Sequence, residues 1–321
     1  MLGLGLLAVL VIDNDPRTIA ASIARLSWRL AIIVTFPAIL VNAVDALGWR
    51  YAFLRNDLPL TTLFSVRVIG EAFNMATPTA TLGGEAMKSW LLRGRLPMSV
   101  TLPSVIVAKT TITIGQALLL MLGVLLARAT VAAHTPLLVA MQWLVVIEAL
   151  ALGTFAVAQT RGLLGRSSRL LQRLGVQPPT ATGEALGRVD DVLARFYREH
   201  PGRLTLSIAF HFAGWLLGAV ETWLILDFLG VPVSLLTAIV IEAFGMAIRA
   251  ATFLIPGNIG ALEGGYAATF AVLGLGSTIG VTFSLVRRIR EVTWIALGLL
   301  LFAIMRPAAE TTAAADPTRS I

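Results

Sequence analysis

Long uninterrupted apolar runs, rather than alternating apolar and polar positions, dominate the chain. Four of these runs occupy residues 30–49, 98–127, 136–158 and 204–229. A run of about 20 apolar residues spans the hydrocarbon layer of a bilayer as a helix, and a helix satisfies its own backbone hydrogen bonds there. A further span is predicted at 279–305, although three arginines and a glutamate lie in its first half. The pattern therefore predicts an all-α, polytopic helical membrane protein.

The polar and short segments predict how these spans are connected. Residues 1–12 are apolar but short, so whether they form a complete span stays open. The rest of the N-terminal region 1–29 is interpreted as an interfacial stretch. Residues 161–203 hold eight arginines against four acids, with apolar residues at helical spacing in their second part. That basic excess predicts a cytoplasmic loop carrying an amphipathic helix. The polar tail 306–321 is expected to be disordered.

Between the long runs lie shorter, interrupted ones. Residues 58–76 and 79–92 are each short for a full crossing and are joined by Thr-Pro-Thr, with basic residues on both flanks. This predicts a re-entrant hairpin that enters and leaves the membrane on one face. In the second half, 235–255 and 259–275 are separated by another proline-containing break.

The two halves also share motifs. Glu71-Ala-Phe-Asn-Met-Ala76 recurs as Glu242-Ala-Phe-Gly-Met-Ala247, and proline precedes glutamate by seven residues in both halves. In the same register Lys109 falls opposite Arg287, and upstream Asp45 matches Glu221. We interpret this as a duplication, with repeat 1 at 30–127, a connecting transmembrane helix at 128–160 and repeat 2 at 204–305. The flanking arginines orient the two repeats oppositely, and inverted repeats with interrupted helices are typical of transporters.

The interruptions predict helix breaks that could bind a ligand. Proline removes a backbone donor, glycine permits positive φ, and the N–H groups of a restarted helix attract anions. The residues predicted to form the breaks are Pro78, Gly83, Gly84, Pro256, Gly260 and Gly264.

Charged residues inside the apolar segments are the candidate substrate-binding residues, because each costs about 2.5–3.5 kcal/mol at bilayer depth. They are Glu85, Lys109, Glu263, Arg287, Arg288, Arg290 and Glu291. Two interpretations stay open: the cations hold a phosphate, or they pair with the acids and only neutralise buried charge. Arg290 and Glu291 are adjacent and cannot face each other, so each needs a partner elsewhere. Asp45 and Glu221 lie near span ends, where they could reach solvent.

Composition restricts the function further. The chain is 57% hydrophobic and 13% charged, with a mean hydropathy of +0.83, against roughly 25% charged residues in soluble domains. Its net charge of +7 comes from basic residues flanking apolar segments, which favours membrane orientation over nucleic-acid binding. The seven tryptophans lie mostly near span ends and are interpreted as interface anchors. With no cysteine, no metal-ligand spacing and no nucleotide loop, we expect neither metal, cofactor nor enzyme activity.

Three stretches resemble a known family: GEAFNMATPTATLGGEAMKSWLLRGR, IEAFGMAIRAATFLIPGNIGALEGGYAATFAVLGL and SLVRRIRE. They resemble the flippase-like family, the transmembrane region of lysylphosphatidylglycerol synthases, over about residues 30 to 305. Within it, AIRAATFLIPGNIGALEGGY and SLVRRIRE most resemble the hopanoid-biosynthesis-associated branch. By position, the polar-site pattern of the family would fall on Glu85, Glu263, Arg287, Arg288 and Arg290, with Pro78 and Pro256 at the breaks.

The resemblance implies a multi-pass protein of the bacterial inner membrane that moves hopanoid or phospholipid between leaflets or membranes. Lysylphosphatidylglycerol synthases also carry a soluble transferase domain, for which the residues after 305 leave no room, so the lipid-translocating part is the one implied. The expected partners are membrane lipids and lipid-biosynthesis enzymes. The alternative function is a non-transporting scaffold for lipid-modifying enzymes.

Overall fold

The computed structural model describes residues 2–55, 58–77, 82–129, 135–160, 180–252 and 255–305. The first half contains α1 (Leu2–Asp13), α2 (Pro16–Leu26), α3 (Trp28–Ala52), α4 (Leu60–Ala76), α5 (Leu82–Leu92) and α6 (Met98–Ala127). The second half contains α7 (Pro136–Thr160), α9 (Thr180–Glu199), α10 (Pro201–Phe228), α11 (Leu235–Ala251), the 3-10 turn η1 (Pro256–Asn258), α12 (Ala261–Val272) and α13 (Ser277–Met305). The described residues contain no strand. Residues 161–179 of the predicted basic loop, and the predicted tail 306–321, lie outside the described residues.

In the described part of the chain, four helices are long and apolar enough to cross a membrane, namely α3, α6, α7 and α10. They coincide with the four long apolar runs of the sequence, so the predicted all-α, polytopic fold is confirmed. Helix α13 is 29 residues long, but the charged residues of its first half distinguish it from these four.

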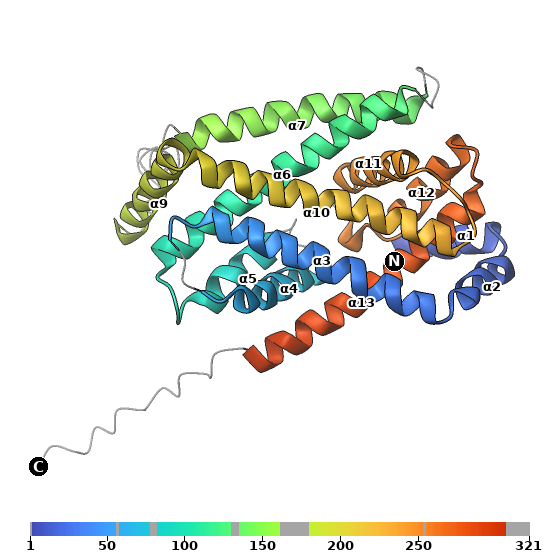
Figure 1. Cartoon of the computed structure of the whole chain (residues 1–321), viewed down its shortest axis with the longest axis horizontal. Coiled ribbons are helices and arrows are strands. Elements are labelled where there is room, and N and C mark those ends of the chain that lie inside the picture. Colours follow the sequence, from blue (N-terminus) through green and yellow to red (C-terminus); the bar gives the residue numbers. More distant parts are fainter. Residues whose placement is uncertain are drawn as a thin grey trace, which may run out of the picture.

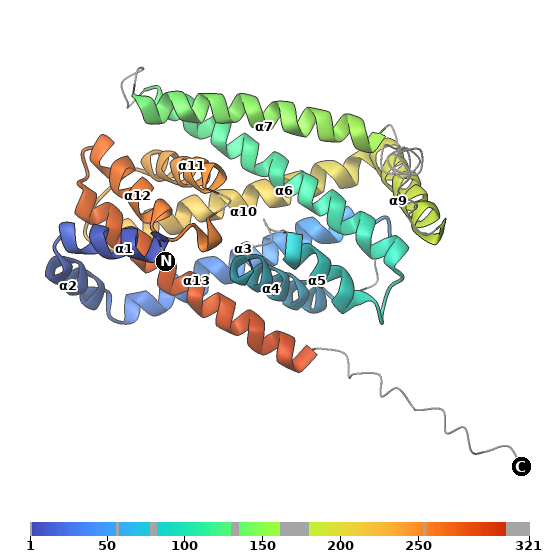
Figure 2. The same ribbon diagram turned by 180° about the vertical axis from the view of Figure 1, so that it is seen from behind.

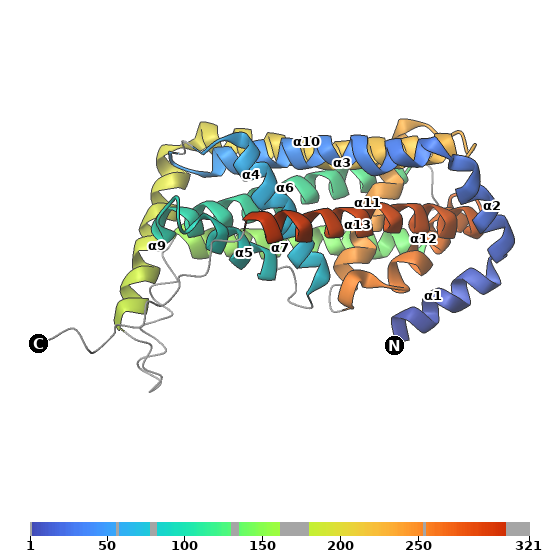
Figure 3. The same ribbon diagram turned by 90° about the horizontal axis from the view of Figure 1, so that it is seen from below.

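The long helices lie along one axis of the molecule. Helices α3 and α10 run side by side in opposite directions (Figure 1), and they form one layer in the view from below (Figure 3). They pack closely because Gly48 has no side chain: an added Cβ would lie 2.5 Å from His211 Nδ1. Ser207 Oγ also donates to the Gly48 carbonyl oxygen at 2.8 Å. Helix α9 covers one end of the bundle, whereas α1 and α2 lie at the other end (Figure 3).

Two helical hairpins enter the bundle from opposite ends. Helices α4 and α5 start and finish toward the α9 end, and α11 and α12 start and finish toward the α1–α2 end (Figures 1 and 2). The first hairpin matches the one predicted from residues 58–76 and 79–92. The described residues of both hairpins meet the bundle at its middle, although the proposed duplication of the chain stays a prediction.

The first hairpin is held together by glycines where its two helices meet. The Gly84 N–H donates to Asn74 Oδ1 at 2.8 Å, and a Cβ added at Gly84 would overlap the carbonyl oxygen of Gly70. Such overpacking costs about 1–3 kcal/mol. We therefore expect Gly84→Val to lower the free energy of unfolding by that amount, measured by denaturant titration in mixed micelles. Gly153→Val on α7 is the control, because no atom lies within 4 Å of its added Cβ; equal losses in both variants would contradict this packing role.

The N-terminal helices cover the second hairpin. Helix α1 has 12 residues, and a Cβ added at Gly260 would lie 2.5 Å from the Gly3 carbonyl oxygen. Helix α2 buries Ile19 and Leu26 and leaves charged residues outside, as expected of an interfacial stretch. Asp15 caps its first turn, and the hydrogen bonds it accepts from Thr18 lower the pKa of that carboxyl.

The hydrophobic core contains separate clusters at the two ends of the bundle. At the α9 end, Phe53, Leu92 and Phe196 belong to one buried cluster. At the α1–α2 end, Leu26 and Phe283 belong to another. Ionisable side chains from α3, α4, α5, α6, α10, α11 and α13 line one cavity, which fixes the position of the candidate site.

Candidate functional site

A cavity of about 320 Å³ lies between the two hairpins and is lined by α3, α4, α5, α6, α10, α11 and α13. Its described acidic residues are Asp45, Glu71, Glu85, Glu221, Glu242 and Glu291. Its described basic residues are Arg67, Lys88, Lys109, Arg249, Arg287 and Arg290. The two lists contain the same number of residues, so the lining has no formal net charge when all of them are ionised and His211 is neutral.

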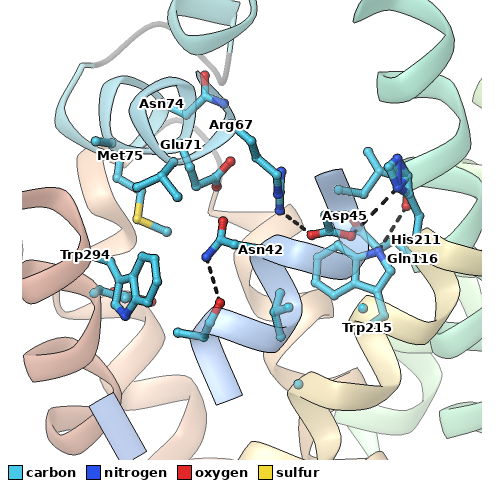
Figure 4. A pocket seen from close by; sticks show the side chains of 18 of the residues that line it. Asn42, Asp45, Arg67, Glu71, Asn74, Met75, Gln116, His211, Trp215 and Trp294 are labelled. Atoms are coloured by element: carbon cyan, nitrogen blue, oxygen red, sulfur yellow. Dashed lines mark hydrogen bonds and ion pairs between the residues drawn. The ribbon is translucent and has the colours of Figure 1, made fainter. Parts of the chain in front are cut away.

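The side chains converge on this space from several helices, as Figure 4 shows. The residues labelled there are Asn42 and Asp45 of α3, Arg67, Glu71, Asn74 and Met75 of α4, Gln116 of α6, His211 and Trp215 of α10, and Trp294 of α13. Uncharged amides and indoles thus alternate with ionisable groups around the cavity. Such a lining offers donors, acceptors and charges of both signs to a polar ligand.

The first-half residues form one group of ion pairs. Arg67 on α4 donates to Asp45 on α3, and His211 Nδ1 lies 3.8 Å from the other oxygen of the same carboxylate. Lys88 Nζ lies 2.9 Å from Glu85 Oε2, and Lys109 Nζ lies 3.9 Å from Glu85 Oε1. These contacts tie the first hairpin to α3 and α6.

The second-half residues form another group, which is more deeply buried. Arg287 donates to both oxygens of Glu242, at 2.7 and 3.2 Å, and to Tyr266 Oη at 2.8 Å. Arg290 Nη1 lies 2.7 Å from Glu221 Oε2, which is fully buried. A bidentate guanidinium–carboxylate pair fixes geometry as well as charge. The first half of α13 is therefore locked to α10 and α11.

A third group of contacts closes the break between α11 and α12. Glu263 Oε2 accepts from the Gly260 N–H at 2.7 Å, and its other oxygen lies 2.7 Å from Arg288 Nη2. Gly260 has φ of 80°, a conformation that glycine adopts without strain. Arg288 also donates to the Gly257 carbonyl oxygen at 2.9 Å and to Glu291 Oε2 at 2.9 Å. The predicted break thus exists, and its glutamate caps the restarted helix.

The structure brings together most of the predicted substrate-binding residues. Those lining the cavity are Glu85, Lys109, Arg287, Arg290 and Glu291, whereas Glu263 and Arg288 lie at the break and are not among its described lining. Arg290 and Glu291 have separate partners, as their adjacency required: Glu221 for the first, and Arg249 and Arg288 for the second.

The predicted helix-break residues occupy several kinds of position. Pro256 begins η1, and Gly260 precedes α12. Gly264 lies in the first turn of α12, while Gly83 and Gly84 are inside α5 rather than before it. Pro78 lies outside the described residues.

The tryptophan interpretation was partly wrong. Trp28 and Trp143 are exposed, as interface anchors would be. Trp49 is buried, however, and it lines the cavity together with Trp215 and Trp294. Position near a span end does not reveal which side of the helix an indole occupies, so the sequence could not separate the two groups.

Several cavity residues were missed by sequence reasoning. Arg67, Lys88 and Arg249 were not assigned to the site, nor were the amides of Asn42 and Gln116. Sequence reasoning could have found one of them. Arg67 is the only basic residue in the apolar stretch 58–76, and an intramembrane charge indicates a functional or paired position.

A comparison with family models assigns most of the chain to one group. The model described as "Lysylphosphatidylglycerol synthase TM region" matches residues 1–300. No curated protein and no solved structure matches the chain. The matched range includes α1 and α2 and most of α13.

Proposed function

The chain belongs to the family of the lysylphosphatidylglycerol synthase transmembrane region, and on this premise we propose that it is a lipid translocase. It is a multi-pass helical membrane protein of a family whose name links it to lipid modification. In the proposal, the polar headgroup of a lipid occupies the central cavity while its apolar part stays among the lipid-facing helices. The lipid then moves between leaflets or membranes, and the protein itself catalyses no covalent reaction.

The charged cavity carries this proposal. Ionisable residues within a bilayer are costly and mark substrate pathways more often than inert packing. Here residues of both signs surround one space of about 320 Å³ instead of being distributed singly along the helices. Hairpins that meet at the middle of the bundle are, in addition, the architecture in which transporters place their substrate.

The proposed cargo is hopanoid or phospholipid, in the bacterial inner membrane with loop 161–203 on the cytoplasmic side. The resemblance of AIRAATFLIPGNIGALEGGY and SLVRRIRE to the hopanoid-associated branch supports a hopanoid. The cations of the cavity support a headgroup with an anionic group. Enzymes of lipid biosynthesis are the proposed protein partners.

Reconstitution into vesicles tests the proposal. We expect purified protein to move a fluorescent, dithionite-quenchable lipid between leaflets, so that dithionite removes more fluorescence than the outer-leaflet share seen in protein-free vesicles. The same fluorescence loss with and without protein, for both hopanoid and phospholipid probes, would reject translocation.

A second function is favoured by the close ion pairs. Because Arg287, Arg288 and Arg290 each lie 2.7 Å from a carboxylate, these residues could serve only to build a rigid scaffold for lipid-modifying enzymes. A scaffold predicts that an enzyme of this kind co-purifies with the protein. It also predicts that removing the charge of Glu263 leaves the lipid distribution of the membrane unchanged.

A further inference from the structure

The basic residues of the cavity differ in how far they reach into open space. The side chains of Arg67, Lys88, Arg287 and Arg290 are between 6% and 16% exposed. Those of Lys109 and Arg249 are 40% and 37% exposed. Because both line the same cavity, these two present the most accessible positive charge inside it.

Lys109 and Arg249 come from different parts of the chain. Lys109 is on α6, beside the first hairpin, and Arg249 is in the last turn of α11, in the second hairpin. Each also has an acid at its side: Glu85 Oε1 lies 3.9 Å from Lys109 Nζ, and Glu291 Oε1 lies 3.5 Å from Arg249 Nη1. Both separations exceed those of the close pairs of Lys88, Arg287 and Arg290, which are 2.7–2.9 Å.

Resting on the proposed translocase function, we propose that Lys109 and Arg249 bind the phosphate of a zwitterionic lipid headgroup, whose ammonium group faces Glu85 and Glu291. Guanidinium and ammonium groups are the usual partners of phosphate in proteins. A phosphate held between α6 and α11 would touch both halves of the molecule at once. The headgroup would then couple the two hairpins.

Charge balance explains why the ligand is a zwitterion. The described acids and bases of the cavity are equal in number, so a net anion would leave an uncompensated charge in a low-dielectric space. A phosphate linked to an ammonium group adds no net charge and still satisfies groups of both signs. An uncharged polyol headgroup, as on a hopanoid, would offer no charged group of either sign to Lys109, Arg249 and their neighbouring acids.

Binding of short-chain lipids tests the proposal directly. Trp215 and Trp294 line the cavity, so their fluorescence reports its occupancy in detergent solution. We expect dihexanoyl-phosphatidylethanolamine to bind about tenfold more tightly than dihexanoyl-phosphatidylglycerol, as one unmatched charge is worth at least that much. Equal binding of the two, or tighter binding of the anionic lipid, would overturn the proposal.

Substitutions distinguish two roles for Lys109 and Arg249: binding the lipid phosphate, or only neutralising the carboxylates beside them. Arg249→Gln and Lys109→Gln should each weaken phosphatidylethanolamine binding about tenfold, while Arg25→Gln on the exposed side of α2 should not change it. The double variant Arg249→Gln/Glu291→Gln restores the charge balance of the cavity but still lacks the guanidinium proposed to bind the phosphate. Its binding of phosphatidylethanolamine should therefore stay weak. Recovery of binding in that double variant would show that Arg249 only neutralises Glu291, and would reject its role.

A change of selectivity gives an independent result. Glu291→Gln leaves the cavity with one excess positive charge, so we expect phosphatidylglycerol to gain affinity relative to phosphatidylethanolamine. Each variant is first checked for a single elution peak and an unchanged melting temperature; should Glu291→Gln fail that check, Glu85→Gln gives the same excess charge. An unchanged ratio in the folded variant would contradict recognition by charge balance.

The hopanoid and phospholipid probes also distinguish failure of the zwitterion proposal from failure of the translocase function on which it rests. If vesicles containing the protein translocate an uncharged hopanoid analogue but bind and move neither phospholipid, translocation stands and the zwitterion proposal falls. If no probe moves, both fall.

Discussion

Replacing Arg287 with glutamine is expected to lower the free energy of unfolding by about 3–5 kcal/mol, because the change leaves the Glu242 carboxylate buried without its partner. The side chains of both residues are 6% exposed. Of its hydrogen bonds within the described residues, Glu242 keeps the one from Thr222, at 2.8 Å, and Tyr266 loses the guanidinium that donates to its hydroxyl oxygen. Denaturant titration in mixed micelles, followed by circular dichroism, measures the loss.

Two further variants identify the cause of that loss. The double variant Arg287→Met/Glu242→Met removes both charges, and replacing a whole buried ion pair with apolar residues is often neutral or stabilising. It should therefore recover most of the stability. Arg198→Gln, on the exposed surface of α9, should change stability by no more than about 0.5 kcal/mol. If Arg287→Gln changed the free energy of unfolding as little as Arg198→Gln, the Arg287–Glu242 ion pair would not be an organising contact of the bundle.

The fold could be predicted from the sequence because membrane helices depend on local properties. The runs at 30–49 and 204–229 are long and apolar enough to identify α3 and α10 without knowledge of their neighbours. The break before Glu263 was also visible, since proline and glycine restrict or free the backbone locally. Helix boundaries within the α4–α5 hairpin were less predictable: Gly83 and Gly84 are inside α5, and Gly84 is held there by its hydrogen bond and close contact with α4.

The pairing of charges could not be predicted in the same way. Sequence reasoning placed Glu263 and Arg288 in the substrate site, but these two bind each other and the backbone of the break. Conversely, Arg249 contributes to the cavity only because the end of α11 lies beside α13, where Glu291 is its neighbour. Which ionisable groups face open space depends on contacts between helices, and no periodicity within one helix contains that information.

Filling the cavity should abolish lipid movement if the proposed function is correct. Ala108 lines the cavity from α6, next to Lys109, so Ala108→Trp would place an indole in the space proposed for the headgroup. A space of about 320 Å³ cannot hold both a tryptophan side chain and a phospholipid headgroup in the same position. We expect the dithionite-accessible fraction to fall to that of protein-free vesicles.

The comparison variants make this loss specific to the cavity. Ala149→Trp introduces the same side chain on the exposed face of α7, where a bulky apolar residue contacts lipid only, and it should leave translocation unchanged. Ala108→Ser enlarges the residue by one polar atom and should retain most of the activity. Translocation by a folded Ala108→Trp protein at the wild-type rate would mean that the lipid headgroup follows another route, and the charged cavity would then be a structural network of ion pairs.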